Sequence, residues 1–183
     1  MTRILALDPA SIMGFAHGPH NGVPVHGVHR LPVKSGHSRI GLALEEFLIG
    51  LIRSGEIEAV YFEKPVMPKV TSFDAMAAMV GKAFVIGMTC ARLGIHAYPI
   101  DMQTWRSEFG VPTAAPRKIK GTAERRAWVK QQTIHRCEVL GFEPKDDNSA
   151  DALGLWHCAA WRMQKKEDAP SLFSTDIAEG LTI

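Results

Sequence analysis

The stretch Ile4-Leu5-Ala6-Leu7-Asp8 places a carboxylate at the end of a short apolar run. A second stretch of the same kind, Ala59-Val60-Tyr61-Phe62-Glu63, also ends on an acid. Apolar runs of this length are typical of buried strands. A carboxylate at the end of a buried strand has lost water, so it must be paired, protonated or bound to a metal ion. Both acids are therefore candidate site residues.

Two further acids precede an apolar helix. Asp147 and Asp151 lie one helical turn apart, and Asn148 lies three residues before Asp151, so both 147 and 148 share its side of the helix. If the strands ending at Asp8 and Glu63 are neighbours, all these groups meet at the carboxyl edge of a sheet. Oxygen ligands of this kind suit Mg²⁺, or Mn²⁺. Such a set can hold two ions roughly 4 Å apart for phosphodiester cleavage. A purely structural role for the acids remains the alternative.

Composition limits the class of protein. A chain of 183 residues with 46% hydrophobic and 22% charged residues is typical of one soluble domain. We expect no apolar stretch long enough to span a bilayer, no membrane partner and no signal peptide. The three cysteines form no CxxC pair, which favours reduced thiols in a cytoplasmic protein.

The hydrophobic pattern predicts alternating strands and helices. The pair Asn21-Gly22 predicts a hairpin turn, and Ser38 is the expected N-cap of a helix that stops at Gly55. This order predicts an α/β fold with a mixed sheet and helices on its faces over residues 1–165, followed by a tail over 166–183. We expect strands over 3–8, 14–17, 23–33, 58–63 and 95–100, and helices over 39–54, 72–93, 103–109, 122–140 and 148–165.

Basic residues are concentrated in one segment. The net charge is only +2, but seven Lys and Arg stand against one acid between Arg117 and Arg136. This segment can neutralise several phosphates of a nucleic acid. The alternative is a solvated helix face next to a surface loop.

Several motifs together resemble a known family. The stretch from Ile4 to Gly14 resembles the first-strand motif of the RuvC-type Holliday junction resolvases, in the ribonuclease H-like superfamily. Val60–Glu63 is similar to the second acidic strand, Asn148–Ala159 to the closing helix, and Gly81–Pro99 to the central helix and the next strand. The resemblance covers about residues 3–163, with the motifs in the family's order.

The resemblance implies a ribonuclease H-like mixed five-stranded sheet flanked by helices. It also implies a Mg²⁺-dependent, homodimeric endonuclease that cuts two opposed strands of a four-way DNA junction. Asp8, Glu63 and Asp151 match catalytic acid positions. Asn148 stands where the family often has Asp or His, so its amide oxygen or the Asp147 carboxylate is the candidate fourth ligand.

The resemblance also suggests DNA and dimer contacts. Helix 72–93 would supply the dimer interface, although an ordinary core helix explains its pattern equally well. The loop after Glu63 can probe the junction centre, or it is a plain connector. The candidate DNA-binding residues are Arg106, Lys118, Lys120, Arg125, Met67 and Lys69.

Other functions remain open. A nuclease of the same fold can act on another nucleic acid, such as a ribosomal RNA precursor. A junction-binding protein with catalysis weakened by Asn148 is a further alternative. The histidines at 17, 20, 26 and 29 fall in a hairpin and favour surface or edge-strand positions over a zinc site. Trp156 and Trp161 favour the core of an apolar helix.

Overall fold

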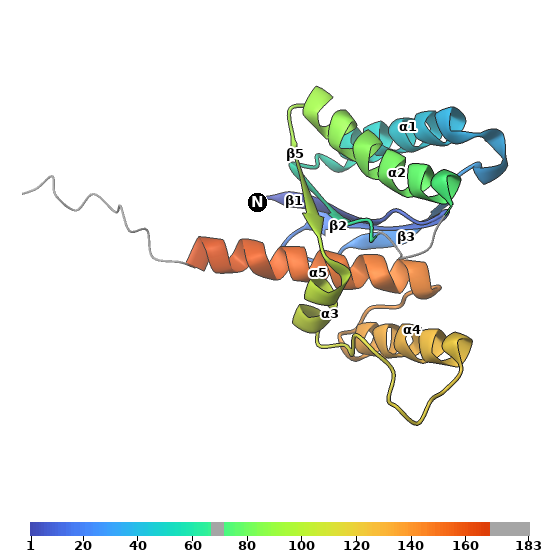
Figure 1. Ribbon diagram of the computed structural model, residues 1–183. Helices are drawn as coiled ribbons and strands as arrows, with labels where there is room; N and C mark the ends of the chain where they lie inside the picture. The colour runs from blue at the N-terminus through green and yellow to red at the C-terminus, as the bar shows by residue number, and fades with distance from the viewer. Residues whose placement is uncertain (67–71, 169–183) are drawn as a thin grey trace, which may run out of the picture.

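The computed structural model describes residues 1–66 and 72–168, which fold into one mixed sheet between two helical layers (Figure 1). The strand order is β3-β2-β1-β4-β5. β1 is antiparallel to β2 and parallel to β4, so the predicted mixed five-stranded sheet is confirmed. The strands are β1 (Arg3–Asp8), β2 (Ile12–Pro19), β3 (Val25–Arg30), β4 (Ala59–Glu63) and β5 (His96–Ile100).

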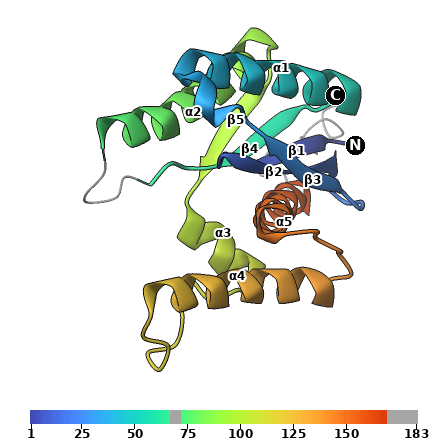
Figure 2. The same ribbon diagram turned by 90° about the vertical axis from the view of Figure 1, so that its right-hand side faces the viewer.

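The helices cover both faces of the sheet. α1 and α2 lie on one face and α5 on the other, with α3 and α4 outside α5 (Figure 2). α5 continues three residues beyond the expected domain end at 165, and residues 169–183 of the expected tail lie outside the described residues. The helices are α1 (His37–Gly55), α2 (Phe73–Arg92), α3 (Met102–Phe109), α4 (Thr122–Val139) and α5 (Asp147–Asp168), with a 3-10 turn at Val33–Ser35.

Alternation along β1 divides the core into two halves. Ile4 and Ala6 are fully buried on the α5 side, whereas Leu5 and Leu7 are fully buried on the side of α1 and α2. Successive side chains of a strand point to opposite faces, so Asp8 continues the row of Ile4 and Ala6. The acid at the end of β1 is therefore directed toward the α5 layer.

Two glycines permit the close approach of α5 to its neighbours. A Cβ atom on Gly14 of β2 would lie 2.0 Å from the backbone oxygen of Asn148, and one on Gly154 of α5 would lie 2.7 Å from the Trp105 ring. Since neither site has room for a side chain, glycine allows the first turn of α5 to rest on the sheet and α3 to rest on α5.

Some sequence expectations need local corrections. Gly36, not Ser38, occupies the N-cap of α1, and it makes no side-chain cap bond. That helix ends at Gly55 as expected, and its C-cap residue, Glu56, adopts the left-handed conformation. Trp161 is 41% exposed rather than buried, because it lies on the outer side of α5 under the Lys165 amine. The turn at Asn21-Gly22 is confirmed by a 2.9 Å bond from the Gly22 N–H to the Pro19 oxygen.

The helix α2 is more apolar and more exposed than expected. By length and composition it could cross a membrane, so the expectation that no such stretch exists is wrong by this criterion. Many soluble helices satisfy the same criterion. Only 17% of its apolar window is buried. The exposed side chains include Phe73, Val80, Phe84 and Met88, so α2 presents an uncovered apolar face.

Candidate active site

Three acids meet at the carboxyl edge of the two central parallel strands. β1 and β4 are direct neighbours, and the pairing of Leu7 with Phe62 brings Asp8 and Glu63 side by side at the strand ends. Asp151 approaches from the second turn of α5. Each of the other two carboxylates raises the pKa of Asp8 by charge repulsion, which shows that the three groups share one site.

Burial makes this cluster costly to ionise. Loss of water, followed by the charges of Glu63 and Asp151, raises the pKa of Asp8 to about 8. Burial also raises the pKa of Asp151 to about 6, although the neighbouring Arg106 opposes the shift. The pKa of Glu63 is raised by burial and lowered in part by a hydrogen bond from Trp105. Carboxyls with raised pKa values in one cleft are typical of functional sites.

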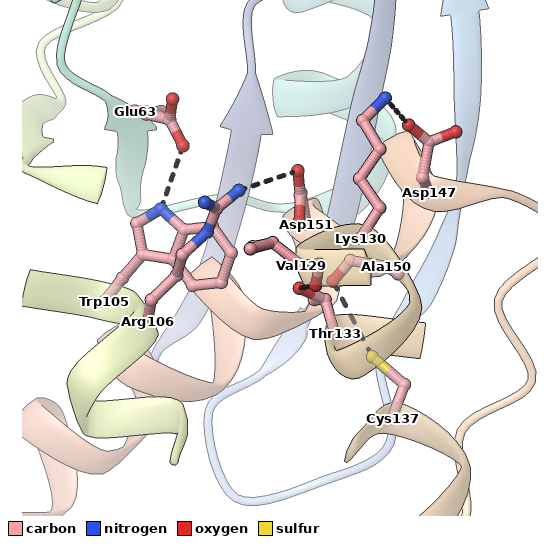
Figure 3. Close-up of polar contacts among 10 residues, drawn as sticks. All are labelled: Glu63, Trp105, Arg106, Val129, Lys130, Thr133, Cys137, Asp147, Ala150 and Asp151. Atoms are coloured by element: carbon pink, nitrogen blue, oxygen red, sulfur yellow. Dashed lines mark hydrogen bonds and ion pairs between the residues drawn. The ribbon is translucent and has the colours of Figure 1, made fainter. Parts of the chain in front are cut away.

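Two neighbouring residues of α3 hold the acids in place (Figure 3). Trp105 Nε1 donates a 2.9 Å hydrogen bond to Glu63 Oε2, and the Arg106 guanidinium lies 3.5 Å from Asp151 Oδ2. Trp105 is fully buried, and the side chains of Arg106 and Asp151 are only 11% and 12% exposed. The sequence predicted a site role for Arg106 but not for Trp105. The only feature of the sequence that pointed to Trp105 was its position directly before that arginine.

The donor atoms fit a hard divalent cation. Among residues 1–66 and 72–168, no three His, Cys, Asp or Glu side chains form a gathered metal-ligand group, and Glu63 and Asp151 contact Trp105 and Arg106 instead. The other oxygen of Asp151, Oδ1, is buried and has no hydrogen-bond partner among residues 1–66 and 72–168. A buried carboxylate oxygen of this kind is costly unless a proton or a cation satisfies it. Mg²⁺ prefers carboxylate oxygens, so the acids present match its chemistry.

The start of α5 separates the two candidates for a fourth ligand. The Asp147 carboxylate forms an ion pair with Lys130 of α4, away from the other acids (Figure 3). The backbone oxygen of Asn148 packs against Gly14. Asp146 caps the helix by accepting a 2.8 Å bond from the Ser149 N–H. The cap and the ion pair fix this turn through Asp146 and Asp147, and within the described residues the Asn148 side chain makes no hydrogen bond.

The predicted DNA-binding residues fall into four groups. Lys118 and Lys120 are exposed on the loop between α3 and α4. Arg125 instead donates hydrogen bonds to the loop carbonyls of Ala115 and Ile119, at 3.1 and 2.8 Å, so its guanidinium shapes the loop. Arg106 lies at the acids, as described above. Met67 and Lys69 lie outside the described residues.

A pocket beside the acids contains a cation that the sequence analysis missed. Asp8 and Glu63 line a pocket of about 260 Å³ together with Lys82 from the middle of α2. Lys82 is partly buried, and the charge of Asp8 raises its pKa against the stronger lowering effect of burial. Lys82 is distant in sequence from every acid motif. The only feature of the sequence that pointed to a site role was its charge inside an otherwise apolar helix.

The solved structures that are similar to this chain share one fold. No protein-family model matches the chain, and no curated protein matches it in sequence. Among solved structures, the chain is similar to a Thermus thermophilus RuvC in complex with a Holliday junction substrate, with a TM-score of 0.65 and 11% identity, over 90% of this chain and 96% of the other. A second Thermus thermophilus RuvC structure gives a TM-score of 0.63 and 12% identity, over 89% and 96%.

A mitochondrial protein has the same fold. The chain is similar to the yeast mitochondrial Holliday junction resolvase, with a TM-score of 0.59 and 10% identity, over 91% of this chain and 81% of the other. At such low identity these likenesses establish the fold. They confirm, at the level of fold, the resemblance to RuvC-type resolvases that the motifs predicted.

Proposed function

We propose that this protein is a divalent-metal-dependent endonuclease that resolves four-way DNA junctions. The observation that carries the proposal is the meeting of Asp8, Glu63 and Asp151 at one sheet edge, where each carboxyl is costly to ionise without a cation. The similarity in fold to junction resolvases supports the substrate class. In this reaction water adds to phosphorus and the P–O3′ bond breaks, leaving a 5′-phosphate and a 3′-hydroxyl.

The residues of the site have distinct roles in this proposal. Asp8, Glu63 and Asp151 would hold Mg²⁺ or Mn²⁺, with the Asn148 amide as the candidate fourth ligand. The bound ion supplies a water of lowered pKa and positive charge for the leaving oxygen. Arg106 lies beside the acids on a buried stem, where its guanidinium can donate to a phosphate oxygen. Trp105 orients Glu63 through its indole N–H.

A second copy of the chain is the partner that best fits the exposed face of α2. Phe73 and Phe84 are 79% and 70% exposed, and monomeric proteins rarely leave large apolar patches uncovered. Two active sites in a homodimer can cut two opposed strands of a junction. Light scattering should give the mass of a dimer, and Phe84→Glu should give a monomer. Val139→Glu, at a 62% exposed position on α4, is the matched control.

The decisive experiment is cleavage of a labelled mobile four-way junction with Mg²⁺ or with EDTA. The wild-type protein should produce paired symmetric nicks that require metal, and Asp8→Asn should abolish them. Linear duplex of the same sequence is the substrate control. Equal cleavage of duplex, single strands or RNA would contradict the junction assignment and favour a nuclease of the same fold with another substrate.

A binding protein with weakened catalysis is the second candidate, favoured by one observation. Asn148 brings no charge to the position beside Asp151, and the neighbouring Asp147 carboxylate is occupied by Lys130. Tight junction binding without cleavage in either Mg²⁺ or Mn²⁺ would support this function. Recovery of cleavage by Asn148→Asp would then identify the missing charge as the cause.

A further inference from the structure

The helix α2 contains three charged residues, and two of them have partners near its ends. Asp74 lies 2.7 Å from the His37 ring, and Arg92 forms an ion pair with Glu45. Lys82 lies at the centre of the helix, and within the described part of the chain no carboxylate comes within ion-pair distance of its amine. A salt bridge therefore does not explain this lysine.

The side chain of Lys82 reaches the active-site pocket. It lines the cavity of about 260 Å³ together with Asp8 and Glu63. At roughly 30 Å³ for each water, this volume corresponds to roughly nine waters, so a phosphodiester group can enter. Asp8 is also the residue whose charge acts on the Lys82 amine. The amine therefore lies beside the acids and faces the same space.

Each helical layer contributes one cation to the site, beside Lys64 at the end of β4, which lines the same pocket and pairs with Asp101. Arg106 comes from α3, which packs on α5, whereas Lys82 comes from α2 on the opposite face of the sheet (Figure 2). Both cations act on Asp8 at the sheet edge between the layers. A phosphate placed at the acids would therefore have a positive group on either side. A lysine amine is a compact point charge that suits a single phosphate oxygen.

We propose that Lys82 contacts a non-bridging oxygen of the phosphodiester group bound at the acids, as a second catalytic cation beside Arg106. This inference rests on the proposed nuclease function. The competing role for Lys82 is a counter-ion of Asp8 that stabilises the metal-free site and never touches the substrate.

The first test is single-turnover cleavage of a four-way junction at saturating Mg²⁺. Lys82→Met should cut about ten- to a hundredfold more slowly, as expected for loss of a charged hydrogen bond to phosphate. Lys82→Arg keeps the charge and should stay within a few fold of the wild type. Arg53→Gln removes an exposed charge near the end of α1, at the opposite edge of the sheet, and should be unchanged.

One measurement besides cleavage separates the roles, and a second checks that metal binding is retained. In EDTA, loss of a phosphate contact should reduce the slope of log affinity against log salt by about one for Lys82→Met. In a thermal-shift titration, Lys82→Met should bind Mg²⁺ as tightly as the wild type or more tightly, because a positive charge near Asp8 is removed. Thermal melts without metal show whether each variant is folded.

The outcomes distinguish the inference from the function on which it rests. Unchanged cleavage and an unchanged salt slope in folded Lys82→Met would overturn the inference and leave the nuclease intact. If the wild type binds a junction without cutting it, the nuclease proposal fails and the salt slope alone decides the role of Lys82. If the wild type neither binds nor cuts junctions, single strands or RNA, both proposals fail.

Discussion

Trp105 Nε1 donates a hydrogen bond to Glu63 Oε2 across 2.9 Å, and through it a fully buried indole orients an acid of the active site. The donor lies on α3 and the acceptor at the end of β4, so the bond joins the outer helices to the sheet edge. Because the bond also opposes the effect of burial on the pKa of Glu63, it favours the ionised form that a cation requires.

Trp105→Phe keeps a buried aromatic ring and removes the N–H donor together with the pyrrole part of the indole. We expect cleavage to fall by about three- to tenfold, the loss that matches a hydrogen bond of about 1 kcal/mol. Because the smaller ring leaves a cavity, the free energy of unfolding should fall by about 1–3 kcal/mol. Single-turnover rates and urea melts check the two effects, with Trp156→Phe, another buried indole of the same core, as the control. Equal rate losses in both variants would mean that repacking, not the bond, matters.

Gly154 allows Trp105 to reach the acids. A Cβ atom there would lie 2.7 Å from Trp105 Cζ3 and 3.0 Å from Phe109 Cδ1, so Gly154→Ala should destabilise the fold by about 1–3 kcal/mol through overpacking. Gly50→Ala is the matched control, because a Cβ atom on this exposed α1 glycine meets nothing within 4 Å. The control should stabilise by about 0.5–1 kcal/mol. A neutral Gly154→Ala in urea melts would contradict the packing argument.

We expect the basic loop between α3 and α4 to bind DNA through the charge of its lysines, in a shape that Arg125 holds. Lys118→Gln with Lys120→Gln should reduce the slope of log affinity against log salt by about two, if each lysine meets one phosphate. Arg125→Lys keeps the charge but loses part of the donor fork that holds Ala115 and Ile119, so it should weaken junction binding. Fluorescence anisotropy across a salt series measures both. An unchanged affinity for Arg125→Lys would show that the loop does not need this clamp.

The stability of the metal-free protein should fall as the pH rises. The pKa of Asp8 is raised from 3.8 to about 8 in the folded state. The stability that the protonated Asp8 carboxyl contributes is therefore fully present below pH 3.8 and is lost as the pH rises through about 8. Asp8→Asn removes this titration. In EDTA, the melting temperature of the wild type relative to Asp8→Asn should therefore fall between about pH 4 and pH 8. A constant difference across this range would contradict the raised pKa.

The sequence predicted the sheet edge better than the helices around it. Strand alternation is a local property, so the strand ends at Asp8 and Glu63 followed from two apolar runs, whereas their convergence required the pairing of β1 with β4 that the structure gives. The bond from Trp105 and the approach of Lys82 depend on how helices pack, which local periodicity does not encode. The N-cap was misplaced at Ser38 because the chain reaches α1 through Gly36, whose φ of +79° ends the preceding turn.

Asp147 and Asn148 are the two candidates near Asp151 for the fourth metal ligand. Asp147 pairs with Lys130, so Asp147→Asn should reduce cleavage by no more than about threefold and should lose a partly exposed ion pair worth at most about 1 kcal/mol. Asp151→Asn should reduce cleavage far more, since its carboxylate lies among the buried acids. Asn148→Asp adds a charge at the candidate fourth position and should bind Mn²⁺ more tightly in a thermal-shift titration. If Asp147→Asn instead lost as much cleavage as Asp151→Asn, Asp147 would have to leave Lys130 and act as the fourth ligand.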